Sequence, residues 1–133
     1  MPIIKKQNKF ESNQKIILFT ATILATILIT RIIIYCLIDI NFKIFNFEFH
    51  HFDYGLILLI IIVLFMLFTE KSKKIYIILS AISLGLIIDE LFFIRKQITG
   101  NNPAIYNPSL AYVLLIAIII SLLAFLISKF SKK

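Results

Sequence analysis

Four long apolar runs constrain this chain more than any other feature of its sequence. The runs cover residues 16–38, 49–69, 75–94 and 108–128. A bilayer hydrocarbon core about 30 Å thick requires roughly 20 residues of α-helix. The chain is 60% hydrophobic over 133 residues, and a soluble domain of that size could not bury so much apolar surface. We therefore predict an all-α, polytopic membrane protein, a single four-helix bundle over residues 1–133.

The basic residues predict how this bundle is oriented. Of the 14 Lys and Arg residues, ten lie near the N-terminus, in the 70–74 connector and near the C-terminus. The positive-inside rule then places both termini in the cytoplasm, with four spans crossing the cell membrane. Topology and anionic lipid headgroups explain the net charge of +7 better than nucleic acid does. We expect membrane lipids as partners, and a homo-oligomer or a larger membrane complex remains open.

The second apolar run is too short without the polar residues before it. Residues 56–68 are purely apolar but would span only about 20 Å as a helix. Either the helix extends back through Gly55, Tyr54, Asp53 and the two histidines, or the bilayer thins locally. His50 and His51 are the only histidines of the chain, and both would lie at or just below a membrane surface.

A second group of ionisable residues lies within the other runs. Asp89 and Glu90 are adjacent in the third run, so a helix separates their directions by about 100°. Gly85 precedes Asp89 by one turn and would let a neighbouring helix approach closely. Arg31, in the first run, either extends to the interface or pairs with a buried carboxylate. Ionisable residues within membrane spans are candidate functional sites by default.

These ionisable groups all fall toward the same, non-cytoplasmic end of the predicted helices, so they can converge. Imidazole and carboxylate together suit zinc, iron or manganese. The candidate metal ligands are His50, His51, Asp53, Asp89 and Glu90. A carboxylate not used as a ligand, Glu90 or Asp89, would orient a ligand or act as a general base.

Several functions are compatible with this cluster. In one hypothesis the cluster binds a divalent transition metal, in a lipid- or peptide-directed hydrolase or in a metal-handling protein. Alternatively, it belongs to a proton or cation channel or transporter subunit, or it is a purely structural ion-pair cluster in an accessory membrane protein. The sequence contains no Ser/His/Asp arrangement, nucleophilic Cys motif or phosphate-binding glycine loop. Whether the protein is an enzyme is left open.

The residues of this cluster also carry a resemblance. The HHFDYG segment at residues 50–55 and the Asp-Glu pair at 89–90 resemble a family of small four-helix integral membrane proteins of archaea and bacteria. That family has an HHFxYG segment and an intramembrane Asp-Glu pair in its third helix. The resemblance covers residues 31–90, although only Gly85 remains of the glycines in the family's third helix. It implies which positions form the site, and it does not indicate a reaction.

Overall fold

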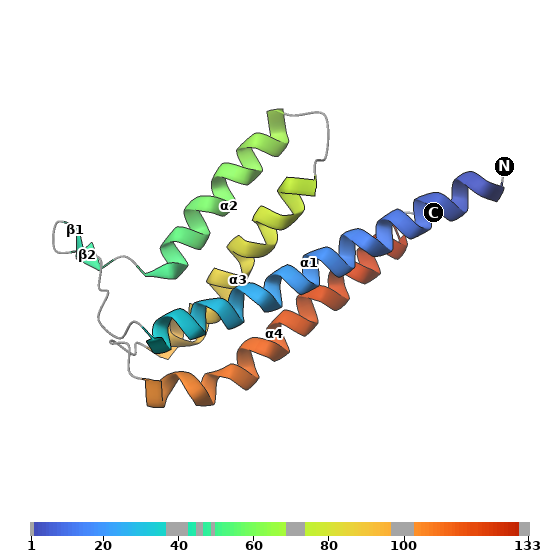
Figure 1. Ribbon diagram of the computed structural model, residues 1–133. Helices are drawn as coiled ribbons and strands as arrows, with labels where there is room; N and C mark the ends of the chain where they lie inside the picture. The colour runs from blue at the N-terminus through green and yellow to red at the C-terminus, as the bar shows by residue number, and fades with distance from the viewer. Residues whose placement is uncertain are drawn as a thin grey trace.

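The chain folds into four long helices. The computed structural model describes the backbone of residues 2–36, 43–44, 47–48, 50–68, 74–96 and 103–130, and the side chains of 13–36, 50–68, 74–92 and 109–130. The helices are α1 (Pro2–Cys36), α2 (His51–Phe68), α3 (Lys74–Lys96) and α4 (Pro103–Phe130) (Figure 1). Between α1 and α2, β1 (Lys43–Ile44) pairs antiparallel with β2 (Phe47–Glu48), with Lys43 opposite Glu48.

Each helix contains a stretch that is long and apolar enough to cross a membrane. In the described part of the chain these stretches are Asn13–Cys36, His51–Phe68, Lys74–Phe92 and Ser109–Phe130. Many of their large apolar side chains face outward, as Leu67 and Phe68 of α2 do. Such a surface requires lipid as its solvent. The prediction of an all-α, four-helix membrane protein is therefore confirmed.

Two helices begin earlier than the apolar runs predict. α1 starts at Pro2 and α4 at Pro103, whereas the runs begin at residues 16 and 108. Proline suits the first position of a helix because the backbone N–H that it lacks would have no partner within the helix. Adding residues to an existing helix avoids the cost of nucleation, so polar residues beside an apolar span can continue it.

Helix α3 is the centre of the bundle. It packs against α1, α2 and α4, whereas α2 packs against α3 alone among the four described helices. Figure 1 shows α1 and α4 lying side by side, with α2 on the other side of α3. The buried core joins α1, α3 and α4 through Ile23, Ile27, Ala81, Ile88, Val113 and Ala117. This arrangement brings the C-terminal halves of α1 and α3 to the same end of the bundle as the N-terminal ends of α2 and α4.

Candidate functional site

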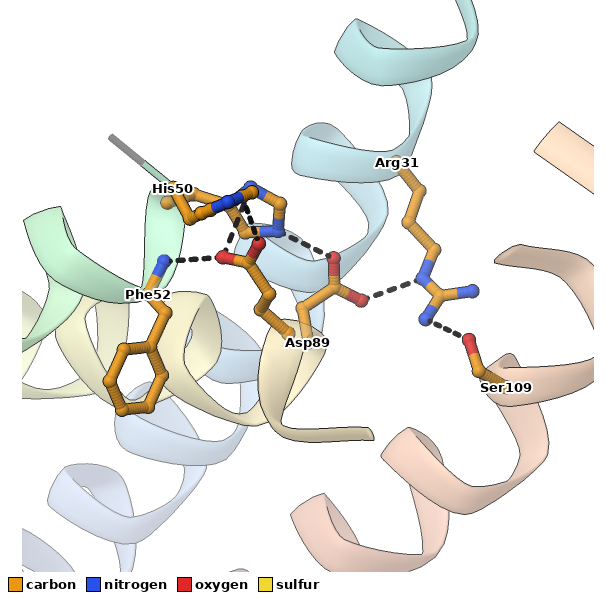
Figure 2. A network of polar contacts seen from close by, with 7 residues as sticks. Arg31, His50, Phe52, Asp89 and Ser109 are labelled. Carbon is orange, nitrogen blue, oxygen red and sulfur yellow. Dashed lines mark hydrogen bonds and ion pairs between the residues drawn. The ribbon is translucent and has the colours of Figure 1, made fainter. Parts of the chain in front are cut away.

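Charged and polar side chains from all four helical segments meet at that end of the bundle, in a group we call the polar cluster (Figure 2). Its acidic members, Asp89 and Glu90, are both buried on α3. The cluster consists of Arg31 from α1, His50 and His51 at the start of α2, Asp89 and Glu90 from α3, and Ser109 from α4.

Arg31 connects three helices. Its Nε lies 2.6 Å from Asp89 Oδ1, and its Nη2 donates a hydrogen bond to Ser109 Oγ at 3.0 Å. The Asp89 and Ser109 residues are fully buried. Of the two possibilities for Arg31, the structure therefore shows the pairing with a buried carboxylate. A buried ion pair is costly to desolvate, and the further hydrogen bond to Ser109 is the kind of contact that offsets this cost.

Glu90 lies over the N-terminus of α2. Its Oε2 accepts a hydrogen bond from the Phe52 backbone N–H at 2.7 Å, and its Oε1 lies 2.8 Å from His50 Nδ1. The first backbone N–H groups of a helix have no partner within it, and a nearby negative charge is favourable there. Glu90 thus caps α2 from a neighbouring helix, which explains how a carboxylate is accommodated at this depth in α3.

Asp53 has a local role in the same helix terminus. Its Oδ2 accepts a hydrogen bond from the His50 backbone N–H at 3.0 Å, while the Asp53 N–H donates to the His50 carbonyl at 3.0 Å. The first contact is one half of a capping box, in which the side chain of the third helical residue accepts from the N–H of the cap residue, here His50. The second contact is a backbone turn bond. The Asp53 carboxylate therefore bonds to the backbone of its own helix terminus. The other four predicted ligands, His50, His51, Asp89 and Glu90, lie close together.

His51 lies between the two acidic side chains. Its Nε2 is 3.6 Å from Asp89 Oδ2, and its Nδ1 is 3.5 Å from Glu90 Oε2. Both distances exceed the usual length of an N–H···O hydrogen bond. The Nε2 and Oδ2 atoms are buried and have no hydrogen-bond partner. Two orphaned polar atoms thus face one another, which is the arrangement in the cluster that most needs a physical explanation.

The two glycines of the predicted site set the spacing of the helices. A Cβ atom on Gly55 would lie 2.9 Å from the Ser83 carbonyl oxygen, and one on Gly85 would lie 2.8 Å from Thr26 Cβ. Ser83 Oγ also donates to the Gly55 carbonyl at 2.6 Å. Gly55 therefore allows α2 to contact α3 closely next to the cluster, and Gly85 does the same for α1 and α3.

Two members of this region were missed by reasoning from sequence. Ser83 lies seven residues before Glu90 on α3, so both occupy the face toward α2, and the available signal was a serine within an apolar helix, one of two on α3. Ser109 lies in a segment expected only to start the fourth helix, and nothing local indicated a bond to Arg31. Tyr54, another predicted site residue, is 46% exposed.

The described side chains of the cluster do not form a complete metal site. Among the described side chains, no group of three or more His, Cys, Asp or Glu residues is placed to hold a metal ion. The two potential donor atoms that lack hydrogen-bond partners are His51 Nε2 and Asp89 Oδ2. For a tetrahedral ion with bonds of about 2.0–2.2 Å, two ligand atoms lie about 3.4 Å apart, close to the 3.6 Å found here.

Comparison of the whole chain with known proteins found no matching family model, no matching curated protein and no matching solved structure.

Proposed function

We propose that this membrane protein binds a cation at His51, within the polar cluster. The observation that supports this proposal is the position of the imidazole between two carboxylate oxygens. A neutral imidazole has one N–H group and one nitrogen lone pair. Whichever nitrogen carries the hydrogen, the other directs its lone pair at a carboxylate oxygen of Asp89 or Glu90. A cation at that nitrogen relieves the repulsion between two buried acceptors.

The formal charge of the cluster supports the same proposal. Arg31 contributes one positive charge, and Asp89 and Glu90 contribute one negative charge each, so neutral histidines leave an excess of one negative charge. Asp53, at the edge of the cluster, adds another. Uncompensated charge is strongly unfavourable away from water. A bound cation therefore compensates the cluster as well as joining His51 to its neighbours.

A divalent transition metal is the first candidate for this cation. An imidazole nitrogen and a carboxylate oxygen are the donor atoms that zinc, iron and manganese accept, and their spacing fits a shared ion. Glu90, facing the other nitrogen of His51, has the position of the carboxylate that orients a metal-bound histidine. His51 and Asp89 would be the protein ligands.

A metal held by these residues would be compatible with hydrolysis of a lipid or peptide. A bound metal lowers the pKa of its water ligand and so supplies a nucleophile. Both Glu90 oxygens already have polar neighbours, the Phe52 N–H and the His50 ring. Glu90 would therefore position His50 and α2. The hydrolase hypothesis holds only if the protein binds a metal.

A second proton on His51 is the other cation that fits. With both nitrogens protonated, the ring would direct one N–H group at each carboxylate, and the cluster would lose its excess charge. This alternative requires no third protein ligand, in keeping with the arrangement of the described side chains. With His51 protonated in this way, the cluster would be either a proton-binding site of a transport subunit or a structural ion-pair cluster of an accessory membrane protein.

Conduction through the bundle receives less support from the described helices. A path away from the cluster would need further polar side chains, and the sequence offers a stripe of threonines on α1 for it, at Thr22, Thr26 and Thr30. The Thr22 hydroxyl donates to the Leu18 carbonyl at 2.7 Å, and the Thr26 hydroxyl donates to the Thr22 carbonyl at 2.8 Å. Thr26 is also the residue against which Gly85 packs. These contacts are those of a helix-packing surface.

The distribution of basic residues supports a location for the site as well. With both termini cytoplasmic under the positive-inside rule, the polar cluster would lie near the outer boundary of the membrane. His50 is the member that would reach toward that boundary, because its side chain is 47% exposed whereas that of Asp89 is fully buried. A ligand would therefore enter from outside, past His50.

Elemental mass spectrometry of detergent-purified protein tests the proposal. We expect near-stoichiometric zinc, iron or manganese in the wild type and its loss in His51→Ala and in Asp89→Asn. Ser121→Ala is the control, because that hydroxyl bonds only to the Ala117 carbonyl of its own helix among the contacts described. Absence of metal after reconstitution would exclude the metal. Thermal stability that is the same in His51→Ala as in the wild type would then exclude the second proton as a charge that holds the cluster together.

A further inference from the structure

On each helix, an aromatic residue follows a member of the polar cluster by about one helical turn. The four pairs are Arg31 and Tyr35 on α1, His51 and Tyr54 on α2, Asp89 and Phe92 on α3, and Ser109 and Tyr112 on α4. Contacts among the four cluster members hold them at one level of the bundle. Side chains on a helix lean toward its N-terminus, so each ring leans back toward that level. The polar cluster therefore has an aromatic side chain beside it on every helix.

Three of these aromatic residues are tyrosines with exposed rings. Tyr35, Tyr54 and Tyr112 are each exposed, and Tyr112 stacks on Phe92 with ring centroids 5.4 Å apart and an interplanar angle of 14°. A tyrosine has an apolar ring and a polar hydroxyl, so one that faces lipid is best accommodated where acyl chains meet headgroups. We call Tyr35, Tyr54 and Tyr112 the tyrosine girdle. Its level indicates where the membrane–water interface meets the bundle.

Exposed apolar side chains at the far ends of the helices limit how deep the cluster can lie. Phe68 ends α2, is 86% exposed and lies 17 positions after His51, which is about 26 Å along the helix. Ile127 of α4 is also exposed and lies 18 positions after Ser109, about 27 Å along its helix. A hydrocarbon core is about 30 Å thick. With both of these side chains in lipid, the cluster must lie within a few ångströms of the opposite edge of the core.

We propose that the tyrosine girdle binds phospholipid headgroups and holds the membrane–water interface at the level of the polar cluster. The phosphate and ester oxygens of a phospholipid accept hydrogen bonds from the tyrosine hydroxyls, while the rings lie among the upper carbons of the acyl chains. A cluster at this level also keeps the charged Arg31–Asp89 pair out of the centre of the bilayer, where charge is most costly. This inference goes beyond cation binding at His51, and it holds with or without a bound cation.

Fluorescence quenching tests the level of the interface. The chain contains no tryptophan, so a single introduced tryptophan is a unique reporter of depth. In bilayers of phosphatidylcholine brominated at either a shallow or a deep acyl position, Tyr112→Trp should be quenched more by the shallow bromines. Ile118→Trp is the matched control, because Ile118 is exposed on the same helix and lies about 9 Å further from the cluster. It should be quenched more by the deep bromines. The same quenching profile in both variants would overturn the assigned interface.

Removal of the hydroxyls tests the headgroup contacts. The triple variant Tyr35→Phe/Tyr54→Phe/Tyr112→Phe keeps all three rings, including the stack on Phe92. Native mass spectrometry of delipidated full-length protein would compare the binding of phosphatidylcholine with that of diacylglycerol, which has no phosphate. The wild type should prefer phosphatidylcholine, and the triple variant should lose about fivefold or more of that preference, the effect of losing at least one hydrogen bond.

The controls and outcomes separate this inference from the proposed function. Ser121→Ala removes a hydroxyl that bonds to the Ala117 carbonyl of its own helix, so it should keep the wild-type preference. Contacts of phosphate with lysines at the other end of the bundle are the same in the wild type and in the triple variant. An unchanged preference in the triple variant would overturn the headgroup contacts. Wild-type protein that contains no metal would overturn the metal and leave the tyrosine girdle unaffected.

Discussion

Arg31 of α1 and Asp89 of α3 are 58 positions apart in the sequence, yet Nε and Oδ1 of these residues lie 2.6 Å apart. Their side chains are 13% and 0% exposed. The pair lies beside the point where α2 meets α3, so it connects the α1/α4 side of the bundle with the acidic residues that hold α2. Its contribution to folding can be separated experimentally from its contribution to ligand binding.

Removal of Arg31 alone should strongly destabilise the protein. In Arg31→Met, Asp89 keeps a buried negative charge without a positive partner, and the expected loss is about 3–5 kcal/mol. The heat-induced loss of the monodisperse peak in size-exclusion chromatography would measure it. The double variant Arg31→Met/Asp89→Leu removes both charges and should recover much of the loss. A double variant as unstable as the single one would show that charge pairing is not the cause.

Gly55→Ala should disturb the contact between α2 and α3. The added Cβ would lie 2.9 Å from the Ser83 carbonyl oxygen, a backbone atom that cannot move away without shifting a helix. Overpacking of this kind typically costs about 1–3 kcal/mol, which exceeds the gain of roughly 1 kcal/mol in helix propensity. Melting temperature would measure the loss. Leu56→Ala, at an adjacent residue that is 41% exposed, is the control and should have the smaller effect.

Asp53 should contribute to stability and not to metal binding. Asp53→Ala removes the acceptor for the His50 backbone N–H, and loss of a capping interaction costs about 1 kcal/mol. Asp53→Asn keeps an acceptor oxygen and should retain most of the stability. Both variants should contain as much metal as the wild type by elemental analysis. Loss of metal in Asp53→Asn would return Asp53 to the set of ligands.

The two histidines should differ in their effects on metal binding. His51 Nε2 faces the orphaned oxygen of Asp89, whereas His50 Nδ1 contacts Glu90 and has an exposed ring. We expect His51→Ala to abolish zinc binding in a titration and His50→Ala to weaken it by less than about tenfold, the effect of losing one hydrogen bond to a charged group. Equal and complete loss in both variants would indicate that both imidazoles are direct ligands.

Much of the fold can be predicted from the local hydropathy pattern of the chain. A run of about 20 apolar residues requires a helix in lipid, because the backbone must satisfy its hydrogen bonds internally. The positions of the polar residues within those runs were enough to select Arg31, His50, His51, Asp89 and Glu90 as neighbours. Each is close to the same end of its helix, and short connections make consecutive helices antiparallel.

The roles of these residues followed instead from the tertiary structure. Asp53 and Glu90 are both carboxylates near α2, but Asp53 bonds to its own helix terminus and Glu90 caps that terminus from α3. The rotation of each helix about its axis decides between such roles, and it depends on packing at Gly55 and Gly85. Likewise, the bond from Arg31 to Ser109 joins residues 78 positions apart, so no local pattern could reveal it.

The sequence by itself therefore determined the four spans, the all-α class and the end of the bundle where ionisable groups gather. Hydropathy and helical rise act within single segments, so they can be evaluated without knowing what lies nearby. Only the tertiary structure decided which carboxylate oxygens of Asp89 and Glu90 contact Arg31 and the histidines. It also decided that Asp89 Oδ2 and His51 Nε2 face one another without hydrogen-bond partners. Such pairings depend on atoms from separate helices, whose relative rotation and depth are set by close packing across the bundle.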